Sequence, residues 1–134
     1  MKRIMKTRTF SRWQRKAKLP DANLCAAVAE MELGLTGADL GGGLFKKRVP
    51  LPGRGKRGSA RTILATNLAS RWFFIFGFEK NDRENITQQE LAFLQMYAGK
   101  LLRFSEEELD LLIMHGEMEV ICNAQDKPHN RRNA

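Results

Sequence analysis

One stretch of the chain, KKRVPLPGRGKRGSAR at residues 46–61, combines residue types that bind phosphate groups. It carries seven lysine or arginine side chains and three glycines, and it contains no acidic residue. Lysine and arginine neutralise phosphate charge, and glycine leaves backbone amides open to an anion. So dense a basic segment suits phosphate chemistry better than core packing. The sequence therefore predicts a surface for a polyanion here.

The glycines of this stretch form a GxGxxG pattern, at Gly53, Gly55 and Gly58. In a dinucleotide-binding fold this pattern must precede a helix, but the RTILATN that follows is typical of a strand. A Walker loop would need Gly-Lys-Ser/Thr, and a kinase would need further motifs that a chain this short does not hold. We therefore expect no cofactor. A loop that follows a phosphate backbone and a plain hairpin loop with positive-φ glycines both remain open.

The other residues that commonly catalyse reactions lack partners at useful spacing. His115 ends a predicted helix and His129 lies in the C-terminal tail, and Ser59 has no histidine close in sequence. Acidic pairs such as Glu79 and Asp82 show no metal-ligand spacing with a histidine. We therefore expect neither a Ser/His/Asp site nor a metal.

The two cysteines are far apart, and the sequence carries no targeting signal. Cys25 and Cys122 belong to no CxxC or Cys/His cluster, so neither a zinc site nor a disulfide framework is indicated, and Cys25 is expected to be a small core residue. No apolar run follows the basic N-terminus as in a signal peptide, and none is long enough to span a membrane. The expected location is the cytoplasm, without membrane association.

Charge is unevenly divided along the 134 residues. Residues 1–72 carry 16 basic and 4 acidic side chains, whereas residues 73–134 carry 7 and 11. This asymmetry favours a polyanionic partner for the first half, either nucleic acid or an acidic protein. A basic surface that serves only solubility is the alternative. The length and the 43% hydrophobic content are typical of one compact domain.

Before the basic stretch, the apolar pattern predicts a strand and two helices. Alternation favours a strand over about Ile4–Phe10. Ser11 is the predicted N-cap of a first helix, and Asp21 after Pro20 begins a second. In the second helix, one buried stripe is expected, made of Leu24, Val28, Met31 and Leu35.

From Leu44 onward, three strand-like runs and two capping boxes can be recognised. The runs are Leu44–Leu51, Ala60–Asn67 and Trp72–Phe78. They predict an antiparallel meander with the basic loop at one end, and the third run, apolar on both faces, is expected to be central. Capping-box pairs at Thr87/Glu90 and Ser105/Glu108 begin two more helices. The predicted fold is α+β, in the order β-α-α-β-β-β-α with an extra C-terminal helix.

Two segments, GGLFKKRVPLPGRGKRGSARTI and the later FGFEKN, resemble the RelE/HigB superfamily of toxins from bacterial type II toxin–antitoxin systems, most closely its HigB-like branch. The resemblance covers about residues 4–103, which implies a toxin domain at 1–104 and a helical extension with a flexible tail at 105–134. It also implies a small cytoplasmic protein that enters the ribosomal A site and cuts mRNA as a metal-independent endoribonuclease.

The residue types suit that chemistry. When an RNA 2′-OH attacks the adjacent phosphate, negative charge builds on the phosphoryl oxygens and on the leaving 5′-oxygen, where cations lower the barrier. In related enzymes lysine and arginine replace a histidine pair. Neighbouring cations lower the pKa of a lysine, so that part of it is uncharged near neutral pH and can accept a proton.

The resemblance also implies roles for individual residues. Arg48, Lys56 and Arg61 match the basic positions of the family's site, and Lys80 matches the lysine that ends its last strand. We expect Lys56 to accept a proton or stabilise charge, and Arg61 to hold the scissile phosphate through its planar fork. Phe78 stands where many relatives have tyrosine, so that base stacking and core packing are both open. Cations expected to grip flanking mRNA or ribosomal RNA are Lys46, Lys47, Arg54 and Arg57.

The expected partners are the ribosome with its mRNA and a cognate antitoxin, either acidic or a helix-turn-helix protein. Operator DNA would be bound only through the antitoxin complex. Two alternatives remain: a ParE-like poison of DNA gyrase, and a nucleic-acid-binding relative that does not cut.

Overall fold

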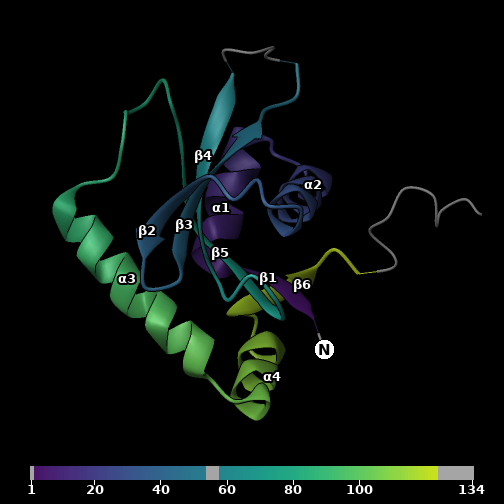
Figure 1. The fold of residues 1–134 in the computed structure, drawn as a ribbon. Coiled ribbons are helices and arrows are strands. Elements are labelled where there is room, and N and C mark those ends of the chain that lie inside the picture. The colour runs from purple at the N-terminus through teal and green to yellow at the C-terminus, as the bar shows by residue number, and fades with distance from the viewer. Residues whose placement is uncertain (1, 54–57, 124–134) are drawn as a thin grey trace, which may run out of the picture.

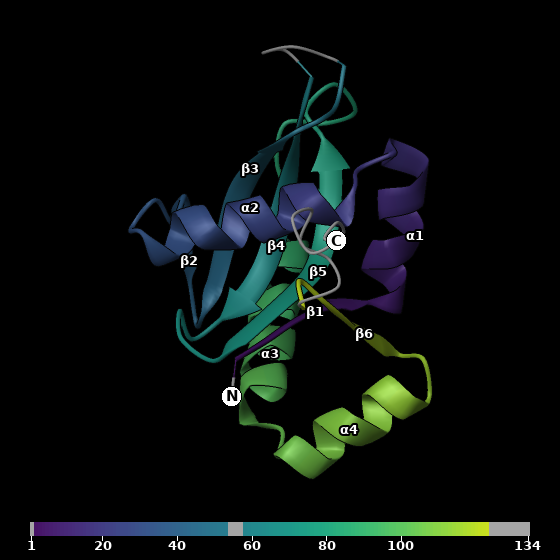
Figure 2. The ribbon, with the colours of Figure 1, turned by 90° about the vertical axis from the view of Figure 1, so that its right-hand side faces the viewer.

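The computed structural model describes residues 2–53 and 58–123. In this part of the chain, a six-stranded sheet is covered by helices on both faces (Figures 1 and 2). Helices α1 (Arg8–Ala17) and α2 (Asp21–Glu32) pack with one face, and α3 (Gln88–Arg103) and α4 (Glu106–Met114) contribute to the core on the other. The fold is therefore α+β, as the sequence predicts.

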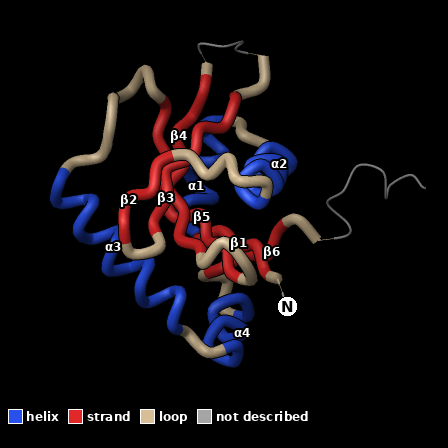
Figure 3. Tube along the Cα trace, viewed as in Figure 1, coloured by secondary structure: helices blue, strands red, loops and turns tan. Residues whose placement is uncertain are grey.

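The strands, red in Figure 3, are β1 (Arg3–Thr7), β2 (Ala38–Gly41), β3 (Leu44–Pro50), β4 (Ser59–Thr66), β5 (Arg71–Glu79) and β6 (Met118–Ile121). They follow the order β2-β3-β4-β5-β1-β6 in the sheet, with β1 and β5 parallel and the other neighbouring pairs antiparallel.

The N-terminal helices differ from the prediction at their ends. Helix α1 begins at Arg8 rather than after Ser11, because the Thr7 hydroxyl accepts a hydrogen bond from the Phe10 amide at 3.1 Å and caps the helix there. Helix α2 begins at Asp21 as predicted and ends where Gly34 adopts a φ of 103°. Leu35 therefore lies beyond the helix and is 62% exposed, so its place in the predicted buried stripe is wrong.

The central meander is confirmed. Strands β3, β4 and β5 pair antiparallel in sequence order, and β5 lies between β4 and β1. Its aromatic run is buried on both faces because helices cover both, with Phe74 facing the α1–α2 side and Phe73 the α3–α4 side. The sequence prediction missed two four-residue edge strands, β2 and β6.

The last two described helices begin as predicted. Thr87 and Ser105 each complete a capping box with the glutamate three residues on. The segment after α3 belongs to the same sheet and core, since Leu109 and Met118 are buried and β6 extends the sheet beside β1. The proposed boundary at residue 104 stays a prediction. Among the described helices, none has the length and apolar content to cross a bilayer.

Cys25 and Cys122 form a disulfide that joins α2 to the residue after β6. The sequence indicated no disulfide, and this expectation is wrong; Cys25 is also only half-buried rather than a core residue. The two cysteines are 97 residues apart in sequence, and they become neighbours only because β6 closes the sheet beside β1, near α2. No local spacing could have indicated this pair.

Candidate nucleic-acid interface

Three side chains lie side by side across β3, β4 and β5. Arg48 is paired with Arg61, and Arg61 with Phe78. Residues directly opposite one another in antiparallel strands point to the same face of the sheet. The two arginines and the phenylalanine therefore form one row across the meander.

A second row runs parallel to the first, one step closer to α3. It consists of Lys46, Ile63 and Phe76, again paired in register. Because strand residues two apart share a face, Lys46 and Arg48 face the α3 side together with the buried Leu44. We call Lys46, Arg48 and Arg61 the cationic patch.

The cationic patch has no carboxylate partner among the described residues. Burial, and secondarily the neighbouring charge of Arg48, lowers the pKa of Arg61 below its usual range. Arg61 donates a hydrogen bond to the Ser59 hydroxyl at 3.0 Å. Within residues 2–53 and 58–123, neither arginine of the patch forms an ion pair, whereas Arg3 and Arg71 both pair with carboxylates of α4. The patch is thus a cluster of like charges without internal neutralisation by the described residues.

The loop between β5 and α3 borders the patch with residues that the sequence analysis did not single out. The Arg83 guanidinium lies over two rings of β5, at 5.2 Å from the Phe76 centroid and 5.4 Å from that of Phe78. It also donates two hydrogen bonds of 2.9 Å to Glu90 at the start of α3. Asn85 accepts a 3.4 Å hydrogen bond from the Lys46 ammonium. A single arginine in an acid-rich loop gives little sequence signal for such a role.

Two of the predicted site residues, Lys47 and Phe78, are buried. Lys47 points to the opposite face, is 8% exposed, and binds Glu30 at 2.8 Å and the Leu35 carbonyl at 2.9 Å. Lys47 is therefore apart from the cationic patch in this structure, and its role as an RNA-binding cation stays a prediction. Phe78 is on the patch side but only 4% exposed, with Arg83 over its ring, and base stacking and core packing both stay open for this residue.

Lys80 is exposed and follows directly after β5, one residue beyond the Glu79–Ala60 pair. Its backbone is therefore at the same end of the sheet as Arg61. Lys56, Arg54 and Arg57 lie outside the described residues. The described residues include no cluster of three side chains suited to a metal ion, and His115 is exposed at the end of α4.

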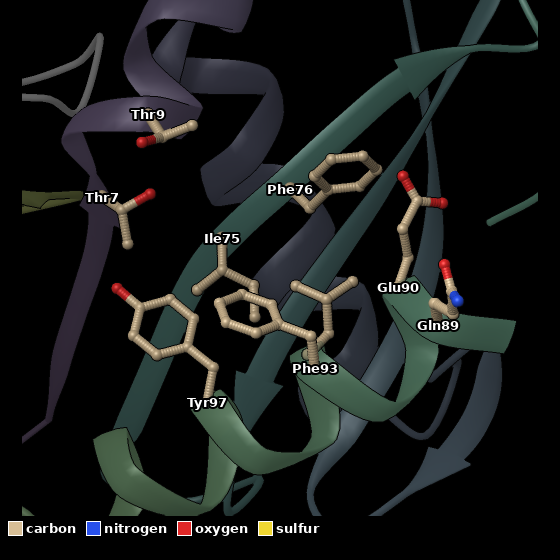
Figure 4. A pocket seen from close by; sticks show the side chains of 9 residues that line it. Thr7, Thr9, Ile75, Phe76, Gln89, Glu90, Phe93 and Tyr97 are labelled. Carbon is tan, nitrogen blue, oxygen red and sulfur yellow. The ribbon is translucent and has the colours of Figure 1, made fainter. Parts of the chain in front are cut away.

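An apolar cavity of about 460 Å³ lies beside the patch, between β5 and α3. In Figure 4, Phe93 and Tyr97 extend from α3 toward Ile75 and Phe76, and Glu90 stands at one end. Burial, and secondarily the charge of Glu117, raises the pKa of the Tyr97 hydroxyl. The cavity meets the patch through Glu90, which holds Arg83.

Comparison with known proteins identifies the family of this chain. No curated protein matches the sequence. The model of one family, described as the RelE toxin of the RelE/RelB toxin–antitoxin system, matches residues 2–121, which include every strand and helix described above. The chain therefore belongs to the RelE toxin family and is a toxin of a toxin–antitoxin system.

Proposed function

We propose that this toxin cleaves mRNA on the ribosome and that the cationic patch binds the RNA at the cleaved bond. The observation that supports this best is the Arg48–Arg61 pair, two like charges held opposite each other without a carboxylate partner among the described residues. A protein gains no stability from such a pair. An anionic ligand removes the repulsion, which explains why the arrangement suits a phosphate.

The proposed reaction is an attack of a ribose 2′-oxygen on the adjacent phosphorus. The bond from phosphorus to the 5′-oxygen breaks, giving a 2′,3′-cyclic phosphate and a 5′-alkoxide. The alkoxide takes a proton from water and becomes the 5′-hydroxyl, which balances the proton that leaves the 2′-hydroxyl. Arg61 would hold the scissile phosphate through its planar fork, while Arg48 stabilises the charge that develops on the phosphoryl oxygens. Both cations would bind the transition state more strongly than the ground state.

The remaining predicted cations would act around this centre. Lys56 remains the proposed acceptor of the 2′-hydroxyl proton or a second charge stabiliser, and Lys80 would bind the RNA from the end of β5. Lys46 would contact a flanking phosphate, together with Arg54 and Arg57. No metal has a role in this proposal, since the cations supply the charge stabilisation.

The partner of a RelE toxin is a RelB-type antitoxin. We propose that an acidic segment of this antitoxin neutralises the cationic patch, because carboxylates would relieve the same repulsion as RNA phosphates. Binding to operator DNA would then occur only through the complex of the two proteins.

The test is to map new RNA 5′ ends after induction of Arg61→Gln, Lys56→Ala and the wild type. The wild type should produce cuts inside translated messages, and each site variant should reduce cutting by about 100-fold or more. Arg12→Gln is the matched control, since Arg12 is an exposed arginine on α1, across the sheet from the patch.

Full cutting by Arg61→Gln would refute the site. Growth arrest without new 5′ ends would instead point to a gyrase poison. RNA binding that depends steeply on salt, without any cutting on ribosomes, would identify a non-catalytic relative.

A further inference from the structure

We propose that Arg83 and Glu90 form a latch over Phe78, and that a base of the bound RNA replaces Arg83 on this ring. This inference rests on the proposed function, because it assigns a base-binding position next to the phosphate-binding cations. It gives Phe78 a role in substrate recognition and gives Arg83 and Glu90 a role in controlling access to it.

The position of Phe78 is the first argument. Its strand pairing sets it directly opposite Arg61, on the same face of the sheet. Cβ atoms of such pairs are roughly 5 Å apart, and longer side chains reach further. A nucleotide whose phosphate is held by Arg61 can therefore bring its base to Phe78 without crossing the sheet.

The second argument is the nature of the group that now covers the ring. A guanidinium is flat and stacks on aromatic faces much as a nucleobase does. Arg83 lies 5.4 Å from the Phe78 centroid, within the range of a cation–π contact. Arg83 thus occupies the position that a stacked base would take.

The third argument is that this cover can be removed. The side chains of Arg83 and Glu90 are each 34% exposed, and Arg83 belongs to the loop between β5 and α3. Solvent screens an ion pair at this exposure, and its bidentate geometry places this one at the stronger end of the range for exposed pairs, so the latch is held in the free protein at a cost that RNA binding can offset. Glu90 keeps its second role after opening, because its carboxylate accepts a hydrogen bond from the Thr87 amide at 2.8 Å and caps α3.

The experiment uses ribosomes programmed with an mRNA that carries 2-aminopurine in the A-site codon, at each of the three positions in turn. A 2′-O-methyl group at each ribose of the codon prevents cleavage. Stacking on an aromatic ring quenches 2-aminopurine fluorescence, so each titration reports both the affinity and the stacking. The variants are Glu90→Gln, which weakens the hold on Arg83 while its side-chain oxygen still accepts from Thr87, and Phe78→Leu, which keeps an apolar side chain.

We expect wild-type toxin to quench one codon position. Glu90→Gln should bind about twofold to fivefold more tightly, as the loss of a partly exposed ion pair predicts. Phe78→Leu should lose the quench and bind about 10-fold more weakly. Combined with Phe78→Leu, Glu90→Gln should bring no gain in affinity.

Glu84→Gln is the matched control, because it removes an exposed negative charge from the same loop. It corrects for any general gain in RNA affinity on losing a carboxylate. If Glu90→Gln gains no more affinity than Glu84→Gln, or if Phe78→Leu retains the quench, the latch is refuted while RNA binding stands. If the wild type does not bind the programmed ribosome at all, the proposed function fails and the latch with it. Since Phe78→Leu can also weaken the core, Glu90→Gln tests the latch independently.

Discussion

Arg48 and Arg61 face each other across β3 and β4 as a directly opposed pair of positive charges. Like charges in this position destabilise a sheet by about 0.2–1 kcal/mol. The pair therefore lowers the stability of the free toxin and raises its affinity for an anion. We expect stability and function to change in opposite directions when this pair is altered.

Arg48→Gln should accordingly raise the free energy of unfolding by about 0.2–1 kcal/mol and reduce toxicity. The gain should shrink as salt is added, because salt screens the repulsion that the substitution removes. Thermal unfolding at low and high ionic strength measures this effect. Lys100→Gln on α3 is the control and should give no gain in Tm. A lower Tm for Arg48→Gln would show that Arg48 stabilises the fold.

Gly77→Ala should destabilise the protein by about 1–3 kcal/mol, the usual cost of overpacking. A methyl group at Gly77 would lie 2.5 Å from ring carbons of Trp13, so α1 would have to move away from β5. Urea unfolding measures the loss. The control is Gly99→Ala in α3, where the nearest atom is the mobile end of Arg103 at 3.1 Å. There alanine should stabilise the helix by about 0.5–1 kcal/mol, and equal effects at both positions would contradict the packing of Trp13.

Reduction of the Cys25–Cys122 disulfide should lower the free energy of unfolding by about 2–5 kcal/mol. The reason is the length of chain between the two cysteines, which gains conformational freedom in the unfolded state when the bond is broken. Denaturation with and without reductant measures the difference. A variant with both cysteines changed to serine should match the reduced protein and show no response to reductant. A response in that variant would assign the effect to something else.

Glu90 should make stability depend on pH in the acidic range. The hydrogen bonds from Arg83, followed by the one from the Thr87 amide, lower the pKa of the Glu90 carboxyl below its ordinary value of 4.5. A group with a lowered folded-state pKa stabilises the protein above its unfolded pKa, and the stabilisation is lost as the pH falls through the folded-state pKa.

The difference in Tm between wild type and Glu90→Gln should therefore be largest above pH 4.5 and decrease below it. Thermal unfolding as a function of pH checks this. Arg83→Gln should show a similarly weakened pH dependence, since it removes the main cause of the shift. A difference that stays constant at every pH would show that the Arg83–Glu90 pair does not form in solution.

The parts of this fold that sequence predicts well are set by local interactions. The capping boxes at Thr87 and Ser105 and the three strands of the meander each depend on residues close in sequence. The β1–β6 pairing and the disulfide depend on segments about 100 residues apart, for which the sequence holds no periodic signal.

The positions of the candidate site residues could be predicted in part, and the separate position of Lys47 could have been predicted as well. Alternation along β3 sets Lys47 on the face of Phe45 and Val49, opposite Lys46 and Arg48, and a strict period of two would have separated them. Arg83 could not have been found in this way, because its role depends on how a loop folds back over β5.

The position of β1 between β5 and β6 has a consequence for the order of synthesis. β1 is made early, yet its neighbours in the sheet are residues 71–74 and 118–121. One of its edges stays open until β5 has emerged, and the other until β6 has emerged. The sheet of this toxin is therefore complete only after residues 118–121 have been translated, which delays the native fold while the chain is still attached to the ribosome that makes it.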